Sequence, residues 1–324
     1  MKKILALTLA LIMIVALVAC GGKDDGAYEL MLSNAYYTAP YGSPLMGAIQ
    51  EKGEAMGYEV TIVDGEVNAD KQLTQFKTAV ADGYDALVYW PGDSASTPPV
   101  VEYLNSTGLP WVVVNTVPLP ELYDQCTIIA SDELQIGREL GKLIVKYYEE
   151  KGSEPLNIAY IEGDSGSSYT INLTKGIHEI IDSYSDIKIL NEAMYSNFDP
   201  ATAMTIMEDL ITKFGNDIDL VVTQDGGMFQ GAYNAIEAAG KLGEYGIICQ
   251  GQDLIVKDKL LSGELYASVA QDPFQEGSLA IEILDKLIKG EAVDAWGPEL
   301  DLTGYEMVFE DAGIVFGKVK TQGK

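Results

Sequence analysis

The chain has 324 residues, with 21 Lys and Arg against 49 Asp and Glu, so its formal net charge is −28 at pH 7. Such an acidic chain is a poor partner for nucleic acid, whose affinity comes from basic side chains, and it would not dock unaided on anionic lipid. Its one histidine, His178, leaves the chain almost without the commonest metal ligand and proton shuttle. We therefore expect no metal site, no cofactor and no enzymatic activity.

The N-terminal segment, residues 1–19, has the pattern of a bacterial export signal. Lys2 and Lys3 precede an apolar run that is shorter than the roughly 20 residues of a membrane-spanning helix. Leu17-Val18-Ala19-Cys20 resembles a lipobox, in which the Cys20 thiol receives lipid, and residues 20–27 would then form a lipidated tether. We expect a chain held by lipid on the outer face of the cell membrane. An ordinary signal peptide followed by an incidental cysteine is the alternative.

The first half of the body alternates between strand and helix periodicity. Short apolar, β-branched runs predict strands at residues 30–33, 60–64, 86–90, 111–115 and 127–130. Amphipathic patterns predict helices at residues 44–56, 71–82 and 98–107. A glycine follows each helix, at Gly57, Gly83 and Gly108, where a left-handed residue commonly ends a helix. This order predicts a parallel sheet with helices on both faces.

The same alternation resumes after residue 130. Helices are expected at residues 133–151, 169–183, 201–214, 228–239 and 274–289. Strands are expected at residues 157–162, 187–193, 220–223, 246–250 and 266–270. The fold class is therefore α/β, with two doubly wound, Rossmann-like domains and a ligand cleft where the carboxyl ends of their strands meet. Cys126 and Cys249 fall in different halves, which favours two buried thiols over a disulfide.

From about residue 28 to the end, the chain resembles the type I periplasmic binding proteins, in their ribose-binding-like branch. The resemblance is carried in order by several segments, none decisive alone. They are residues 32–34 with 39–41, residues 86–93, residues 109–115, Ile129-Ala130-Ser131-Asp132 with Gly137 and Gly141, Ala270-Gln271-Asp272-Pro273, and residues 289–291.

The resemblance implies three hinge crossovers, near residues 118–130, 271–274 and 297–302. It divides the body into an N-terminal lobe of residues 28–129 plus 272–299 and a C-terminal lobe of residues 130–271 plus 300–324. The two lobes would close around the ligand. The protein is expected to be a monomer that delivers its ligand to the permease subunits of an ABC transporter.

The resemblance also implies the ligand-binding positions. They are Tyr36, Tyr41, Trp90, Asn115, Tyr169, Asn172, Phe198, Asp225, Asp253 and Gln271. Aromatic faces cover the apolar face of a sugar ring, and Asn, Gln and Asp fix the orientation of hydroxyl groups. Trp90 and Phe198 could instead be core aromatics, and Asp253 could cap a helix that follows it.

Both arginines expected in the family's pocket are missing, because Asn115-Thr116 and Asn172 stand at their positions. This disfavours ribose itself and any anionic ligand, since Arg is the preferred clamp for carboxylate and phosphate groups. We expect a small neutral sugar or polyol. A nucleoside or an amine ligand with the same transport role, or a receptor role in chemotaxis or signalling, are the open alternatives.

A hydrolase is the remaining rival, because Gly163-Asp164-Ser165-Gly166-Ser167 is similar to a serine-protease nucleophile motif. A catalytic triad needs a histidine within hydrogen-bond reach of the serine. The one histidine, His178, lies in the helix that follows this loop, so no separate segment supplies the base, which disfavours a hydrolase. A phosphate loop is excluded because no Gly-Lys-Ser/Thr follows the glycines. The segment is better explained as cleft lining.

Overall fold

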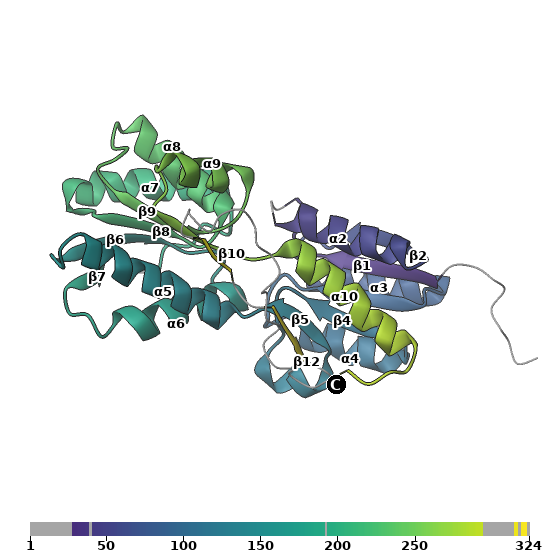
Figure 1. Ribbon diagram of the computed structural model, residues 1–324. Coiled ribbons are helices and arrows are strands. Elements are labelled where there is room, and N and C mark those ends of the chain that lie inside the picture. The colour runs from purple at the N-terminus through teal and green to yellow at the C-terminus, as the bar shows by residue number, and fades with distance from the viewer. Residues whose placement is uncertain (1–27, 39–40, 192, 294–313, 317–318, 323–324) are drawn as a thin grey trace, which may run out of the picture.

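The computed structural model describes residues 28–38, 41–191, 193–293, 314–316 and 319–322. These residues form two lobes, each a sheet of parallel strands between helices (Figure 1). The predicted signal peptide, the Cys20 lipidation site and the third crossover lie outside the described residues. Within those residues, no helix is long and apolar enough to cross a membrane.

The first lobe contains a six-stranded sheet with the order β12-β5-β4-β3-β1-β2. Five strands are parallel and β12 is antiparallel to β5. The elements of this lobe are β1 (Tyr28–Asn34), α2 (Gly42–Ala55), β2 (Tyr58–Asp64), α3 (Ala69–Asp82), β3 (Ala86–Trp90), α4 (Pro98–Thr107), β4 (Trp111–Val114), the 3₁₀ helix η1 (Pro120–Gln125), β5 (Ile128–Ser131), α10 (Pro273–Ile288) and β12 (Val319–Gln322).

The second lobe contains a six-stranded parallel sheet with the order β11-β10-β9-β8-β6-β7. The elements of this lobe are α5 (Glu133–Glu150), β6 (Leu156–Ile161), α6 (Ser168–Ile181), β7 (Ile187–Ile189), α7 (Pro200–Phe214), the 3₁₀ helix η2 (Gly215–Asp217), β8 (Leu220–Thr223), α8 (Gly226–Ala238), β9 (Gly246–Gln250), α9 (Leu254–Ser262), β10 (Ala267–Ala270) and β11 (Ile314–Phe316). The predicted α/β class with two doubly wound parallel sheets is confirmed.

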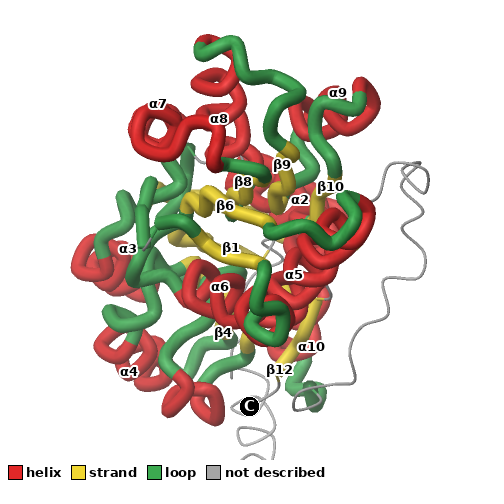
Figure 2. The backbone as a smooth tube through the Cα atoms, turned by 90° about the vertical axis from the view of Figure 1, so that its left-hand side faces the viewer, coloured by secondary structure: helices red, strands yellow, loops and turns green. Residues whose placement is uncertain are grey.

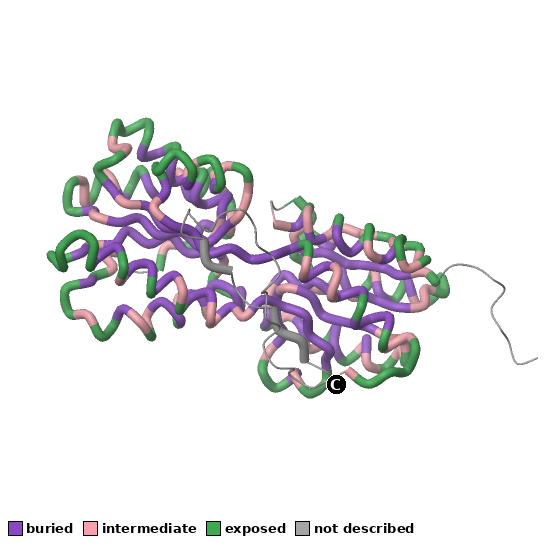
Figure 3. Tube along the Cα trace, viewed as in Figure 1, coloured by how far each residue is buried: buried purple, intermediate pink, exposed green. Residues whose placement is uncertain are grey.

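The central strands of each sheet are buried on both faces, which is why β3, β4 and β8 are largely apolar runs (Figure 3). In the first lobe, α2 and α10 cover one face and α3 and α4 the other. In the second lobe, α7 and α8 cover one face and α5 and α6 the other (Figure 2). Cys126 and Cys249 are buried thiols, one in each lobe.

The chain passes between the lobes at two described places, and a capped helix begins directly after each passage. β5 leads into α5, whose N-cap Asp132 accepts a hydrogen bond from the backbone N–H of Gln135. β10 leads into α10, whose N-cap Asp272 accepts from Phe274 and Gln275. Each cap supplies partners for helix donors that would otherwise be unpaired, so both crossovers have a fixed local geometry.

The structure differs from the sequence-based expectation in three places. Residues 319–322, predicted in the C-terminal lobe, form β12 and pair with β5 of the first sheet. Helix α9 was not predicted from the sequence. Its apolar residues do not lie on one face, because Val256 is buried and Leu254 is exposed, so the helix lacks a clear amphipathic pattern. β7 ends at Ile189, four residues before the expected end.

Close contact between α5 and α6 depends on Gly137. A Cβ atom at this position would lie 2.3 Å from the carbonyl oxygen of Leu173. We expect Gly137→Ala to lower the free energy of unfolding by about 2 kcal/mol, because the helices must move apart. Gly47→Ala is the matched control: Gly47 lies in α2 with nothing near its Cβ, so the helix should gain about 0.5–1 kcal/mol. Equal effects in urea unfolding would contradict this.

Candidate ligand-binding cleft

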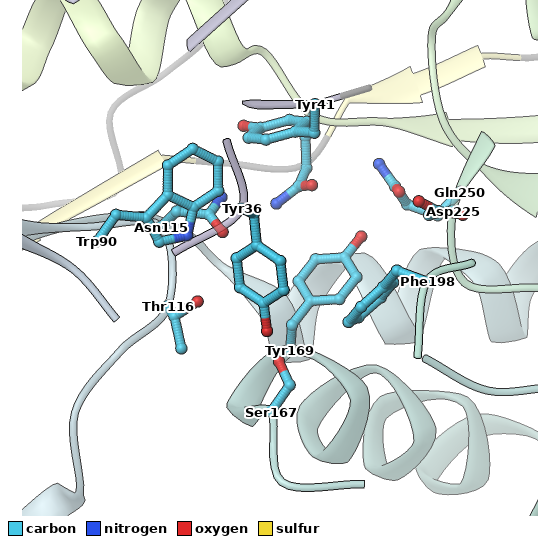
Figure 4. Close-up of a pocket in the computed structure, with 11 residues that line it drawn as sticks. Tyr36, Tyr41, Trp90, Asn115, Thr116, Ser167, Tyr169, Phe198, Asp225 and Gln250 are labelled. Carbon is cyan, nitrogen blue, oxygen red and sulfur yellow. The ribbon is translucent and has the colours of Figure 1, made fainter. Parts of the chain in front are cut away.

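A cavity lies between the two lobes, at the carboxyl ends of their strands (Figure 4). Its walls come from both lobes, so any occupant would touch both. The lining residues are Tyr36, Tyr41, Trp90, Asn115, Thr116, Ser167, Tyr169, Phe198, Asp225, Gln250 and Gln271.

Five aromatic rings form a connected wall of this cavity. The ring of Tyr36 lies 6.0 Å from that of Trp90 and 6.3 Å from that of Phe198, between centroids. Tyr41 stands edge-on to Trp90 at 6.3 Å, and Tyr169 lies 6.1 Å from Phe198. The contact between Tyr36 and Phe198 joins the two lobes. Aromatic faces of this kind pack against the C–H face of a ring-shaped ligand.

Two lining residues have left-handed backbone conformations. Asn115 has φ 62° and Phe198 has φ 57°. Asparagine tolerates this region, but a bulky residue such as Phe rarely does, and strain of this kind concentrates at functional sites. The neighbouring loop makes room for the ring: a Cβ on Gly163 would lie 2.3 Å from a ring carbon of Phe198. The local chain is therefore shaped to present this aromatic side chain to the cavity.

Three polar groups on the cavity wall are buried and lack a hydrogen-bond partner among the described residues. They are the indole N–H of Trp90, the hydroxyl of Tyr169 and the amide nitrogen of Gln250. These side chains belong to residues that are 2 %, 8 % and 3 % exposed. An unpaired buried polar group costs roughly 1–3 kcal/mol. An occupant that offers hydrogen-bond acceptors would remove this cost.

The carboxyl groups around the cavity are partly or fully buried, and none of them has a cationic partner among the described residues. Asp225 caps α8 by accepting a 2.6 Å hydrogen bond from the Met228 N–H, and burial raises its pKa to about 7. Glu276 of α10 lies behind the wall and accepts from the hydroxyl groups of Tyr41, at 3.0 Å, and Ser131, at 3.2 Å, and from the Asn115 side chain. Burial also raises the pKa of Glu276 to about 7.

Glu133, the first residue of α5, is the corresponding buried carboxyl of the second lobe. It accepts hydrogen bonds from Ser168, at 2.9 Å, and from the side chain of Asn172, at 2.7 Å. Burial raises its pKa to about 7, and the negative charge of Glu276 adds to the shift. Glu133 and Glu276 therefore stand at the two helix starts that follow the crossovers.

Eight of the ten residues predicted as ligand-binding line the cavity, which brings them together but leaves their role in binding a prediction. They are Tyr36, Tyr41, Trp90, Asn115, Tyr169, Phe198, Asp225 and Gln271. Asn172 is not among them, because its side chain turns to Glu133 and lines a separate hollow near the first crossover. Asp253 lines an adjoining cavity, which shares Tyr41, Asp225 and Gln250 with the first.

From the sequence, a helix-capping role is the alternative for Asp253. Asp253 does directly precede α9, but its side chain makes no capping hydrogen bond. Three lining residues were not in the predicted set: Thr116, Ser167 and Gln250. Gln250 ends β9 and Thr116 lies just beyond β4, so the rule that ligands bind at the carboxyl ends of parallel strands could have found these two residues. Glu133 and Glu276 gave no signal, because an acidic residue in a first helical turn is ordinary.

The fold and the cavity together define a two-lobed binding protein. The sequence matches the periplasmic binding protein domain over residues 30–292. The chain therefore belongs to the periplasmic binding protein family.

Among characterised relatives, the chain is similar to the ribose import binding protein RbsB of Bacillus subtilis, with 29% identity over 279 residues, which is 84% of this chain and 85% of that protein. It is also 29% identical to the xylitol-binding protein of Mycolicibacterium smegmatis, over 74% of this chain and 67% of that one. A solved structure with a similar fold is an ABC transporter solute-binding protein of Bacillus halodurans with bound myo-inositol. Its TM-score is 0.77 and its identity 21%, over 92% of this chain and 96% of that one.

The buried carboxyl of Glu276 predicts a pH dependence of folding. Its pKa in the folded chain, about 7, exceeds the ordinary 4.5, so folding favours the protonated form. The stabilisation of the folded chain by protonated Glu276 is complete below about pH 4.5 and is lost as the pH rises through 7. At about 1.4 kcal/mol per pKa unit, the loss is roughly 3 kcal/mol.

We therefore expect Glu276→Gln to unfold at a higher temperature than the wild type at pH 8, and to differ little at pH 5. Glu102→Gln, an exposed site on α4, is the control and should follow the wild type at both values. A variant whose melting temperature is lower than that of the wild type at pH 8 would contradict the assignment.

Proposed function

We propose that this protein is the extracytoplasmic solute-binding component of an ABC importer, and that it binds a small sugar or polyol in the cleft between its lobes. The observation that carries the proposal is the set of buried, unpaired polar groups of Trp90, Tyr169 and Gln250 on an aromatic wall. A sugar matches both features of the wall. Its hydroxyl and ring oxygens accept hydrogen bonds from the polar groups, and its C–H face packs on the aromatic rings.

The relatives favour the same ligand class. One is named for ribose import and another for xylitol, and a protein of similar fold was solved with myo-inositol. The three ligands share a small carbon frame with several hydroxyl groups. The aromatic residues and polar strand ends of this cleft fit that chemistry, and the proposal makes binding, not catalysis, the task of the site.

Binding would favour the closed arrangement of the lobes. Trp90 belongs to the first lobe, whereas Tyr169 and Gln250 belong to the second, so a ligand that pairs with all three holds the lobes together. The empty protein would favour an open form, and the ligand would shift the population by its extra contacts in the closed one. The permease subunits would then receive the closed, loaded form.

Tyr169→Phe tests the cleft most cleanly. The hydroxyl of Tyr169 has no partner within the described residues, so its removal should leave the melting temperature of the empty protein unchanged or slightly higher. The same change should weaken sugar binding about tenfold, or about 1.4 kcal/mol. Calorimetric titration and thermal unfolding measure the two quantities.

Tyr37→Phe is the matched control, because Tyr37 lies near Tyr36 but is 43 % exposed and does not line the cavity. It should alter neither quantity. If Tyr169→Phe binds sugar as tightly as the wild type, the cleft assignment is wrong.

The proposal also places the protein on the outer face of the cell membrane, anchored by lipid on Cys20. Replacing Cys20 with Ser removes the thiol that would carry the lipid, so the variant should move from the membrane fraction to the soluble fraction of the host. Sugar binding by the variant should equal that of the wild type, because Cys20 precedes the folded body. A wild-type chain found only in the soluble fraction would overturn the anchor and leave the binding function intact.

A further inference from the structure

The cleft combines acidic groups with a lack of basic ones. Asp225 lines both adjoining cavities, and Asp253 lines the second. No Lys, Arg or His is among the described residues that line either cavity. The two arginines that the family resemblance implied are replaced by neutral residues at Asn115-Thr116 and Asn172. The walls therefore present carboxyl groups with no basic side chain beside them in the lining.

The carboxyl groups behind the walls repeat this pattern. Glu276 is fully buried, and its hydrogen bonds come from neutral donors, while its Oε1 atom is buried without a partner. Glu133 is also bonded by neutral donors, Ser168 and Asn172. Buried carboxylates ordinarily have a cationic partner, because desolvation of a lone charge is costly. The missing positive charge could come from the ligand.

The rest of the wall suits a cation that also carries oxygen atoms. The faces of the five aromatic rings attract a positive group through their quadrupoles. The N–H groups of Trp90 and Gln250 need acceptors, and in Figure 4 the Gln250 side chain projects towards the centre of the cavity near Asp225. An anion would be repelled, and a simple alkylamine would leave both N–H groups unpaired.

We propose that the ligand is a sugar-sized polyol that carries a protonated amino group, with the ammonium group held between the Asp225 carboxylate and the aromatic wall and the hydroxyl groups paired with Trp90 and Gln250. The inference rests on the proposed function and narrows its ligand class to amino sugars and amino cyclitols. It also revises the expectation of a neutral ligand. The Asp253 carboxyl interacts electrostatically with Asp225, and Asp225 does so with the hydroxyl of Tyr169.

Binding of such a ligand should release protons. Asp253, the N-cap of α9, acts on Asp225, which acts in turn on Tyr169 of α6 and on the Cys249 thiol of β9, and burial raises the pKa of Asp225 to about 7. Glu276 is faced by Tyr41 and Asp272, and it acts in turn on Glu133. A nearby ammonium group favours the ionised carboxylates and lowers their pKa values. Affinity should therefore increase with pH from 5 to about 7.5, with protons released to the buffer.

The test is calorimetric titration of the mature protein with matched sugars at pH 7.5. The panel contains glucose, galactose, mannose and an inositol, their monoamino derivatives, and the N-acetyl forms of the three amino hexoses, which carry no positive charge. We expect an amino compound to bind at least tenfold more tightly than its neutral parent and its N-acetyl form. Repetition in buffers of different ionisation enthalpy should show proton release for the amino compound.

Asp225→Asn separates the charge from the shape of the site, because asparagine can also cap α8. It should reduce the preference for the amino compound over its neutral parent at least tenfold. Asp70→Asn makes the same chemical change in the exposed first turn of α3 and should leave the preference unchanged.

The outcomes distinguish this inference from the proposed function. Preferred binding of an amino compound, lost in Asp225→Asn, supports both. Tight binding of a neutral sugar, with its amino derivative equal or weaker, overturns the inference and leaves the proposed function standing. If no sugar or cyclitol of the panel binds, charged or neutral, both are overturned.

Discussion

Parallel strands impose the constraint on which this molecule depends. Their connections must return to the start of the sheet, so the parallel strands of a lobe all end at the same edge. In both lobes that edge faces the other lobe, and the loops that leave it supply the walls of the cleft. Trp90 and Gln250 are the last residues of β3 and β9, and Asn115 and Gln271 follow β4 and β10 directly. The position of the site is thus a consequence of the topology.

The aromatic and polar side chains at the strand ends determine which ligands the cleft can bind. Burying an aromatic wall stabilises each lobe, but the polar groups that come with it keep unpaired hydrogen-bonding capacity, and the Asp225 carboxyl is buried with no basic residue in the cavity lining. These features cost stability in the empty protein, and a ligand with acceptor oxygens and a positive group would offset them. The same atoms that weaken the empty state would thereby determine which ligand is accepted, and contact with both lobes would link recognition to closure.

The sequence was sufficient for the fold class because its apolar runs and helix patterns alternate clearly, as at residues 86–107. The family resemblance also located most of the cleft, because it implied positions such as Trp90 and Asn115, which lie at or next to strand ends that face the cavity. The sequence failed where tertiary pairing decides, as for β12, whose partner β5 is distant in the chain. The sequence also did not indicate the place of Asn172, whose side chain donates a hydrogen bond to the buried carboxyl of Glu133 and lines a separate pocket. The surroundings of the Glu133 and Glu276 carboxyl groups cannot be deduced from the local sequence pattern, because their hydrogen-bond partners are distant in the chain.

A crystal structure of the protein with its bound sugar would test the central claim most directly. The account predicts ligand density between the lobes, with oxygen atoms of the ligand within hydrogen-bond distance of the Trp90 indole nitrogen, the Tyr169 hydroxyl and the Gln250 amide, and with its ring against the aromatic wall. A ligand bound elsewhere, or one in the cleft that leaves these three groups unpaired, would contradict it.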